Sequence, residues 1–188
     1  GIGSNGLTSA RHDVFNKNIK ELYPETFDNS LSDDLVYTGS KNIKDKVENS
    51  PLNAGKLVLS PTRTYAPILN EVFNNIGRNN INGIIHCSGG AQTKILHFID
   101  NLHIIKDNLF DIPPVFELIQ AESSTEWREM YQVFNMGHRM ELYVDEKFAD
   151  EIIKTSKSFD VDAKIIGRVQ SSNEKKLTIS SKYGTFEY

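Results

Sequence analysis

The mix of strands and helices predicts an α+β or α/β fold in which helices flank a mixed β-sheet, and we expect an α+β fold that is a three-layer α/β/α domain. Three observations support this prediction. Apolar residues recur at helical spacing in several segments, short apolar runs separate these segments, and after Gly137 the apolar period changes from helical to alternating. The chain has 188 residues, which suffices for a substantial core, and we expect residues 1–188 to form a single domain.

The first half of the chain contains two helical patterns. Residues 7–23 carry apolar side chains at helical spacing and end before a proline. Residues 65–76 show a second such stripe, which ends at a glycine. Because Pro67 lies too deep for a first helical position, this second helix either begins near Ala66 or is kinked.

A polar stretch separates the two patterns. Residues 24–55 are rich in Asp, Asn, Ser and Gly and have few apolar anchors. We expect a long surface excursion there, with one possible short helix near residues 43–47. Loops of this length are uncommon in compact domains unless they cover something. Residues 57–59 then predict a short strand.

The second half alternates short strands with helices. In the strand near residues 139–144, Met140, Leu142 and Val144 alternate with polar residues, which is typical of a half-buried strand. The other expected strands are residues 81–87, 164–169 and 177–179, and the expected helices are residues 91–99, 113–119, 125–134 and 147–156.

Composition argues against several classes of protein. The chain has 21 Lys+Arg and 25 Asp+Glu, a formal charge of −4, and no Lys/Arg stripe, so we expect no nucleic-acid binding. No apolar run is long enough for a membrane span and no leader pattern occurs, so we expect no membrane partner and a cytoplasmic location. Cys87 is the single cysteine and the five histidines lack metal spacing, so we expect neither disulfides nor metal ligands.

A pair of glycines follows the strand at residues 81–87. Ser88, Gly89 and Gly90 precede a helix expected to open at Ala91, and a helix N-terminus presents N–H groups that attract anions. Glycines let a phosphate approach the backbone, and Thr93 adds a hydroxyl in the first turn. The alternative is a tight strand-to-helix turn that binds nothing. The motif is not a Walker P-loop, because the Gly-Lys-Ser/Thr ending is missing.

Other junctions carry further candidates. Arg63 could form a bidentate pair with a phosphate or carboxylate, or be a surface arginine. Asn135 could point its amide at a ligand, or only bond the turn before Gly137. His86 lies beside the glycine pair and is the histidine most worth testing. Cys87 is expected to be buried packing and not a nucleophile.

Four sequence blocks occur in a fixed order along the chain: residues 3–9 (GSNGLTS), 59–65 (LSPTRTY), 84–93 (IIHCSGGAQT) and 129–137 (EMYQVFNMG). Together they resemble the C-terminal domain of the aminoimidazole ribonucleotide synthetase family, also called phosphoribosylformylglycinamidine cyclo-ligases. The last block is the most specific. The chain departs from the family pattern at two places: Ala91 replaces a third glycine, and His138 with Arg139 replaces small or apolar residues.

The resemblance implies a two-domain, ATP-dependent enzyme of de novo purine synthesis. In that family ATP phosphorylates the formyl amide oxygen of formylglycinamidine ribonucleotide, and ring closure yields aminoimidazole ribonucleotide. The N-terminal domain carries most ligands of ATP and Mg²⁺ and much of a homodimer contact. This chain would be the C-terminal domain, inactive alone, which holds the phosphoribosyl substrate beside its own N-terminal ATP-binding domain, absent from this sequence.

The resemblance also identifies residues that we expect to contact the substrate, while it assigns no catalytic residue. The backbone of the glycine pair is expected to face a phosphate group, and the remaining residues to orient the substrate. The complete set is Ser88, Gly89, Gly90, Ala91, Thr93, Arg63, Asn135, His86, Asn5 and Gly6.

Alternatives remain open at this level. A non-catalytic phosphometabolite-binding or interaction module on the same scaffold would bind a ribonucleotide without ATP. A face left uncovered by a missing neighbouring domain could also make the chain self-associate. The chain begins with Gly1 and not Met, which suggests a piece of a longer protein, or a processed or tag-derived terminus.

Overall fold

The computed structural model describes residue 2, residues 6–61 and residues 63–188. The chain divides into two compact units, and we describe each by itself. Unit 1 comprises Gly1–Thr62, Ser88–Gln92 and Asp111–Gly137, and unit 2 comprises Arg63–Cys87, Thr93–Phe110 and His138–Tyr188.

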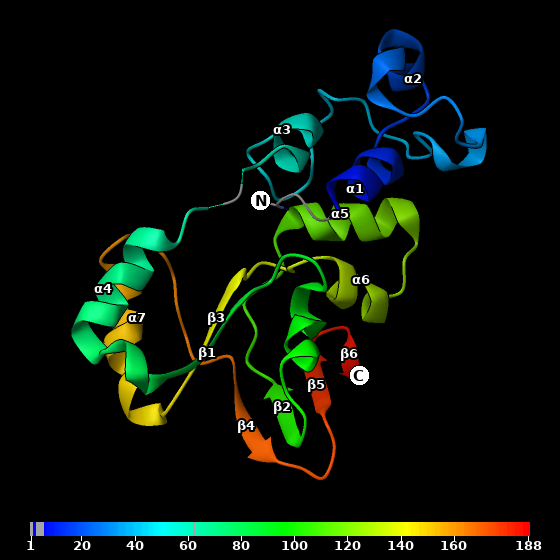
Figure 1. Cartoon of the computed structure of the whole chain (residues 1–188). Helices are drawn as coiled ribbons and strands as arrows, with labels where there is room; N and C mark the ends of the chain where they lie inside the picture. Colours follow the sequence, from blue (N-terminus) through cyan, green and yellow to red (C-terminus); the bar gives the residue numbers. More distant parts are fainter. Residues whose placement is uncertain (1, 3–5, 62) are drawn as a thin grey trace. The chain divides into compact units, whose positions relative to one another are not determined.

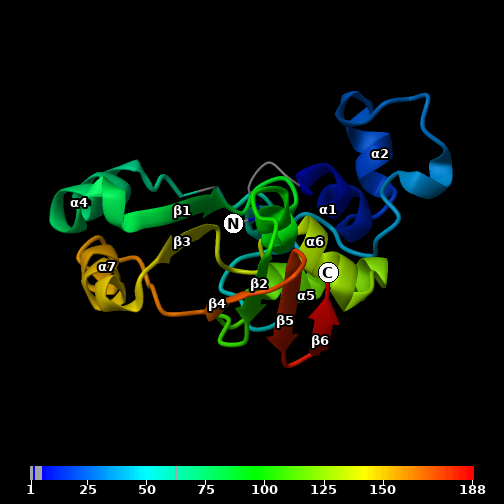
Figure 2. The same ribbon diagram turned by 60° about the horizontal axis from the view of Figure 1, so that its bottom comes forward.

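Unit 1 is helical. Helix α1 (Leu7–Val14) lies beside α5 (Pro114–Ser123) in both views (Figures 1 and 2), and α6 (Trp127–Val133) packs on α5. The core between these helices is apolar because their inward positions carry aliphatic and aromatic residues. Its most buried side chains are Ala10, Val14, Val36, Phe116, Ile119 and Met130. The shorter elements of unit 1 are α2 (Asn18–Leu22), α3 (Ala54–Val58) and the 3-10 turns η1 (Pro24–Thr26) and η2 (Asp33–Leu35).

Two expectations for this part of the chain were wrong. The single helix expected over residues 7–23 is interrupted at Phe15, whose backbone is extended and forms a bridge with Lys41. No strand forms at residues 57–59: Leu57 and Val58 belong to helix α3 and Leu59 is its C-cap. The side chain of Asn53 caps the N-terminus of this helix by accepting from the N–H of Lys56 at 3.0 Å. Local capping outweighed the β propensity of this short apolar run.

The polar excursion at residues 24–55 belongs to unit 1 and is held in place by specific contacts. Tyr37 is 1% exposed, and its hydroxyl lies 2.7 Å from the hydroxyl of Thr26. Ser40 donates from its N–H and its hydroxyl to the carboxylate of Glu122, at 2.7 and 2.8 Å. No helix forms over residues 43–47, since the described backbone there is in turns and a bridge between Lys46 and Asn53.

Unit 2 contains two sheets. Strands β1 (Ile81–His86) and β3 (Met140–Val144) form an antiparallel pair. The second sheet has four strands in the order β4-β2-β5-β6, with β2 (Leu102–Lys106) parallel to β5 (Lys176–Ser181) and the other neighbours antiparallel. The edge strands are β4 (Gly167–Ser171) and β6 (Gly184–Glu187). The mixed sheet is confirmed, whereas β2 and β6 were not anticipated.

The helices of unit 2 pack as a pair. Helix α4 (Ala66–Ile76) begins at Ala66 with Pro67 in its first turn, which settles the choice between a start and a kink. It lies beside α7 (Ala149–Lys157) in both views (Figures 1 and 2), and its residues Ile68, Val72 and Ile76 form their buried core. The 3-10 turns η3 (Arg78–Asn80) and η5 (Glu146–Phe148) precede β1 and α7.

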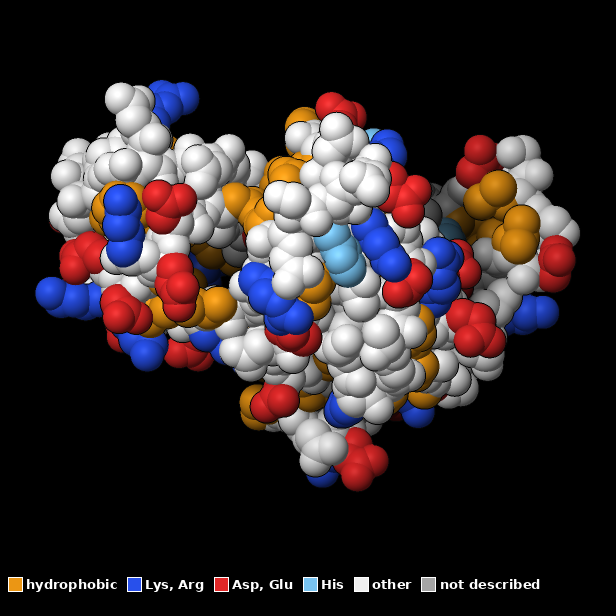
Figure 3. Space-filling view, turned by 90° about the horizontal axis from the view of Figure 1, so that it is seen from below, with side chains coloured by type: hydrophobic (Ala, Val, Ile, Leu, Met, Phe, Trp, Pro, Cys, Tyr) orange, Lys and Arg blue, Asp and Glu red, His pale blue; other side chains and the backbone are white. Residues whose placement is uncertain are grey.

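The α+β class is therefore confirmed, with helices and mixed β-structure in one chain. The helix expected over residues 91–99 is shorter and tighter, a 3-10 helix η4 (Ala91–His97). Positive and negative side chains are interspersed over the face drawn in Figure 3. Within the described part of the chain, no helix has both the length and the apolar character needed to cross a lipid bilayer.

Candidate functional site

A buried polar cluster lies in unit 2 where β3 meets the mixed sheet. The expected strand pattern placed Met140, Leu142 and Val144 toward the core, but Glu141 is the buried residue of β3 and its neighbours are half-buried. A carboxylate in this position needs partners, because an unpaired buried charge is strongly destabilising. We call its surroundings the Glu141 cluster, which consists of Glu141, Lys106, His138, Tyr143 and Cys87.

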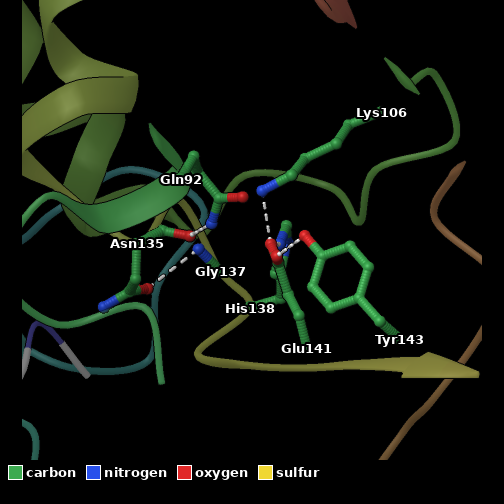
Figure 4. Close-up of polar contacts among 7 residues, drawn as sticks. All are labelled: Gln92, Lys106, Asn135, Gly137, His138, Glu141 and Tyr143. Atoms are coloured by element: carbon green, nitrogen blue, oxygen red, sulfur yellow. Dashed lines mark hydrogen bonds and ion pairs between the residues drawn. The ribbon is translucent and has the colours of Figure 1, made fainter. Parts of the chain in front are cut away.

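The carboxylate of Glu141 receives hydrogen bonds from three side chains (Figure 4). Its Oε1 lies 2.5 Å from Nζ of Lys106 and 2.8 Å from Nε2 of His138. Its Oε2 accepts the hydroxyl of Tyr143 at 2.7 Å. Because the ionised carboxylate can only accept, Nε2 of His138 carries the proton of this bond.

Burial and these partners set the protonation states of the cluster. Burial acts to raise the pKa of Glu141, but Lys106 and then His138 outweigh it and lower the pKa to about 2. Burial lowers the pKa of His138, so the imidazole is held neutral against the pull of Glu141. Burial, and after it the charge of Glu141, raises the pKa of Tyr143 and of the Cys87 thiol.

The same cluster contains three groups that could ligate a metal. One ligand atom each of Cys87, His138 and Glu141 lies within 4.8 Å of the others. However, the shared oxygen of Glu141 already holds the Lys106 ammonium at 2.5 Å, and a divalent cation at that oxygen would face this positive charge at close range. The arrangement therefore fits a satisfied ion pair better than a metal site, and we assign no cation to it.

A second group of side chains gathers at the end of β1, also in unit 2. We call it the Tyr65 cluster, consisting of Tyr65, Arg63, His86, Lys94 and Arg139. The ring of Tyr65 lies 6.4 Å from that of His86 in an edge-on arrangement, and Nζ of Lys94 donates to the carbonyl of His86 at 3.2 Å. The backbone of Arg139 is held by the N–H of Cys87, which donates to the Arg139 carbonyl at 2.7 Å.

Two arginines of the Tyr65 cluster act on the Tyr65 hydroxyl. Burial raises the pKa of the Tyr65 hydroxyl, and the guanidinium groups of Arg139 and Arg63 partly oppose that rise. Arg63 and His86 are exposed, and Lys94 and Arg139 are half-buried. The group is thus a cationic and aromatic surface that solvent can reach.

The glycine pair has a different geometry from the one expected. Ala91 adopts a left-handed backbone with φ 42° and is 1% exposed, and its N–H donates to the carbonyl of Ser88 at 2.6 Å. This bond closes a tight turn, which was the alternative considered for the motif. The amide of Ala91 is therefore engaged, and the helix after it is a short 3-10 segment, not an α-helix that would gather N–H groups.

The side chain of Asn135 forms hydrogen bonds to the backbone within unit 1. Its side chain is buried, donates to the carbonyl of Ile2 at 2.9 Å and accepts the N–H of Gly137 at 3.0 Å (Figure 4). Gln92, which sequence reasoning did not single out, donates to the carbonyl of Asn135 at 2.7 Å. The sequence blocks at residues 84–93 and 129–137 are thus joined within unit 1 by the buried side chain of Gln92.

The expected substrate-binding residues are divided between the two units. Asn5 lies outside the described residues. Gly6 has a left-handed backbone at the start of α1, where a Cβ would fall 2.5 Å from the ring of Phe134. The expected substrate-binding residues in unit 1 are Gly6, Ser88, Gly89, Gly90, Ala91 and Asn135, and the expected ones in unit 2 are Arg63, His86 and Thr93.

The sequence analysis singled out neither Lys106, Glu141 nor Lys94, and it noted Arg139 only as a departure from the family pattern. One signal was available for Glu141: a charged residue stands between the apolar residues Met140 and Leu142 of a strand. Alternation alone assigned it to the solvent face. Its burial became visible only with the position of Lys106, which comes from a strand that the sequence did not reveal.

Comparison with known proteins identifies the family. The family model described as "AIR synthase related protein, C-terminal domain" matches residues 36–180. The chain belongs to this family. The resemblance based on the four sequence blocks is thereby confirmed.

Three curated relatives of this AIR synthase related chain share a name. The phosphoribosylformylglycinamidine cyclo-ligase of Syntrophus aciditrophicus is 31% identical over 190 residues, covering 96% of this chain and 47% of the relative. The proteins of that name from Methanopyrus kandleri and Methanocaldococcus jannaschii are each 31% identical, over 90% and 93% of this chain and 41% and 43% of the relative. The chain therefore spans less than half the length of these curated relatives.

Proposed function

We propose that this chain is the C-terminal, substrate-side domain of a phosphoribosylformylglycinamidine cyclo-ligase of de novo purine biosynthesis. The observation that carries the proposal is the similarity to proteins of that name over at least nine-tenths of the chain. The proposal includes a preceding ATP-binding domain, a homodimer of the whole protein and a cytoplasmic location, as the resemblance and the composition led us to expect.

The proposed reaction is an ATP-dependent ring closure. ATP with Mg²⁺, held mainly by the preceding domain, would supply the phosphoryl group that converts the formyl amide oxygen into a leaving group. The amidine nitrogen then forms a bond to that carbon as the carbon–oxygen bond breaks and phosphate leaves. The task of this chain is to hold the ribonucleotide in position, which is a large part of catalysis when the chemistry itself is supplied elsewhere.

The proposed contacts to the ribonucleotide come from exposed or half-exposed residues. Gly89 is exposed at the tip of its turn, and Ser88 and Gly90 are half-exposed beside it. Arg63, His86 and Thr93 of unit 2 are the other candidates. Asn135, Gly6 and Ala91 are proposed to act through backbone shape, because the Asn135 amide and the Ala91 N–H already bond within unit 1.

The proposal is tested by measuring ring closure with the whole protein that the gene encodes. We expect conversion of formylglycinamidine ribonucleotide that requires ATP and Mg²⁺, restored growth without purines in a bacterium lacking its cyclo-ligase, and no turnover by the 188-residue chain alone. Absence of conversion by the encoded protein would contradict the proposal. Binding of the ribonucleotide without conversion would favour the non-catalytic module instead.

A glycine substitution tests the turn. Gly89→Val in the encoded protein should raise the Michaelis constant for the ribonucleotide or abolish ring closure, because a branched side chain would cover the tip of the turn. Gly83→Ala is the matched control, since its added Cβ would meet Tyr143 at an ordinary 3.6 Å. Unchanged kinetics for Gly89→Val would exclude the turn from the substrate site.

A further inference from the structure

Strand β4 lies at an open edge of the mixed sheet in unit 2. It pairs with β2 on one side, and no described strand pairs with its other side (Figures 1 and 2). Four of its five residues are exposed, among them Val169 at 46%. An edge strand presents unpaired backbone N–H and C=O groups, with which a strand of another chain can pair. We therefore asked which groups of β4 face this open side.

Hydrogen bonds just beyond the two ends of β4 fix the direction of its backbone. The carbonyl of Ile166 accepts from the N–H of Asp107 at 3.2 Å. At the other end, the N–H of Ser172 donates to the carbonyl of Asn101 at 3.1 Å. Asp107 and Asn101 flank β2, so Ile166 and Ser172 both direct backbone groups toward that strand.

The remaining residues of β4 follow by alternation. In an antiparallel ladder every second residue directs its N–H and C=O groups to the same side. Arg168 and Gln170 therefore face β2, whereas Gly167, Val169 and Ser171 direct their backbone groups to the open side. No described residue forms a hydrogen bond with the outward groups of these three.

The side chain of Val169 ends an apolar layer at this edge. Val169 is paired in register with Ile104 of β2, which is buried, so the two side chains lie on the core face of the sheet. Leu102, two residues from Ile104 on that face, is half-exposed at 36%. An apolar side chain placed beside Val169 would continue the layer and remove its edge from water.

We propose that the open edge of β4 binds a second copy of this chain, so that the two mixed sheets join across a two-fold axis into one continuous sheet. The inference goes beyond the proposed function and does not depend on it. The contact lies within this chain, apart from the homodimer contact expected of the preceding domain. Because β4 has only five residues, the interface is small and the dimer is weak.

Strand β4 is complementary to itself in one antiparallel register. With the two-fold axis at Val169, this residue faces Val169 of the second copy. In the same register Arg168 faces the neutral Gln170, so no like charges meet. Gly167 faces Ser171, which brings the outward backbone groups of both copies opposite one another. About six backbone hydrogen bonds result, since each facing pair of outward residues exchanges two.

The other edge of the sheet is less suited to such pairing. Leu177 of β5 and Tyr188 exchange backbone hydrogen bonds at 3.0 and 2.9 Å. By the same alternation only Thr185 and Glu187 of β6 direct backbone groups outward. Glu187 is charged and lies 3.1 Å from Lys176. Charged side chains protect an edge from pairing, whereas β4 has no outward-facing charged residue, no proline and no bulge.

Sedimentation equilibrium of the 188-residue chain tests the inference. The average mass should rise from the monomer toward the dimer value between about 10 µM and about 1 mM, the range expected for a small interface. Val169→Lys should raise the dissociation constant at least about tenfold, because it places like charges face to face at the axis. Thr185→Lys is the matched control at the β6 edge and should leave the constant unchanged.

Two further variants test the register and the backbone pairing. Val169→Glu should also weaken the dimer, but an equimolar mixture of Val169→Glu with Val169→Lys should dimerise again, because residue 169 faces itself in this register. Val169→Pro removes an outward N–H and no bond to β2, so it should abolish the dimer while circular dichroism shows a folded chain.

Four outcomes would overturn the inference. The chain could remain monomeric at the highest concentration, which would leave the edge to a strand of another protein. The dissociation constant could be the same for the unmodified chain and for folded Val169→Lys and Val169→Pro. Thr185→Lys alone could abolish the dimer, which would place the contact at β6. Finally, the mixture of oppositely charged variants could stay monomeric, which would exclude the antiparallel register centred on Val169.

Discussion

Lys106 and Glu141 form an ion pair of 2.5 Å whose side chains are only 2% and 3% exposed. Lys106 is the last residue of β2 in the mixed sheet, and Glu141 belongs to β3 of the antiparallel pair. The pair therefore joins the two sheets of unit 2 through charge instead of apolar packing. Removal of one partner leaves the other charged and without water.

Lys106→Met should destabilise the protein strongly. The substitution leaves the Glu141 carboxylate buried without its ammonium, which typically costs about 3–5 kcal/mol of unfolding free energy. Urea unfolding followed by circular dichroism measures this loss. The double variant Lys106→Met/Glu141→Gln should be more stable than the single variant, because the uncompensated charge is gone.

An exposed ion pair provides the control for this experiment. Lys147 lies 3.9 Å from Asp145, with side chains 70% and 67% exposed. Lys147→Met should change the unfolding free energy by less than about 0.5 kcal/mol, as surface pairs usually do. Equal effects of Lys106→Met and Lys147→Met would show that the buried pair has no special energetic role.

Acid should destabilise the fold through His138 and Glu141. Burial lowers the pKa of His138 below its ordinary 6.5, so protonation favours the unfolded chain and stability falls as the pH drops below 6.5. The pKa of Glu141 is lowered from 4.5 to about 2, so a further loss of stability occurs between these values. His12 acts in the same direction, because burial, and after it Arg11, lowers its pKa.

Urea unfolding across this pH range checks the prediction. The unfolding free energy should decrease from pH 7 to pH 5, and His138→Gln should reduce the slope of that decrease. His97→Gln at an exposed position is the control and should keep the original slope. A flat profile for the unmodified chain over this range would contradict the buried, neutral state of His138.

Gly167 should tolerate no side chain, whereas Gly83 should. A Cβ at Gly167 would lie 1.9 Å from the carbonyl oxygen of Ile105, inside the β2–β4 ladder, so backbone would have to move. Gly167→Ala should therefore lower the unfolding free energy by more than about 1 kcal/mol, as incompatible Gly-to-Ala changes do. Gly83→Ala should be neutral or stabilising, and thermal unfolding of both variants compares them. A neutral Gly167→Ala would show that this part of the ladder yields easily.

Cys87 should be unreactive in the folded protein. Burial raises the pKa of its thiol and the side chain is 4% exposed, so the thiolate required for alkylation is both scarce and inaccessible. Iodoacetamide should modify the folded chain more than about tenfold more slowly than the urea-unfolded chain, with mass spectrometry as the readout. Equal rates in the two states would mean that the β1 end opens readily.

Several elements were predictable because their cause is local. Helix α4 begins at Ala66 because Pro67 suits a first turn, and its apolar stripe is complete within eleven residues. Strand β1 likewise follows from a short apolar run bounded by turn residues, and β3 follows from the alternation of apolar and polar residues after Gly137. The burial of Cys87 also agreed with its place at the end of β1.

Other elements depended on contacts distant in sequence. Strand β2 is stabilised by β4 and β5, which follow more than 60 residues later, so its own pattern was too weak to identify it. The single helix expected over residues 7–23 is interrupted at Phe15, whose bridge to Lys41 depends on a distant segment. Tertiary pairing overrode local propensity at both places.

The candidate site likewise contains some residues that the sequence indicated and others that only the tertiary structure revealed. Residue types alone raised Arg63 as a possible ligand of a phosphate or carboxylate and His86 as the histidine most worth testing, and the four sequence blocks indicated the family. Only the tertiary structure placed Arg139 and Lys94 beside them, assigned the Asn135 amide to the backbone of Ile2, and showed Glu141 buried against Lys106. The physical reason is that periodicity and capping act between neighbours in the chain, whereas the pairing of buried charges depends on which strands meet in space.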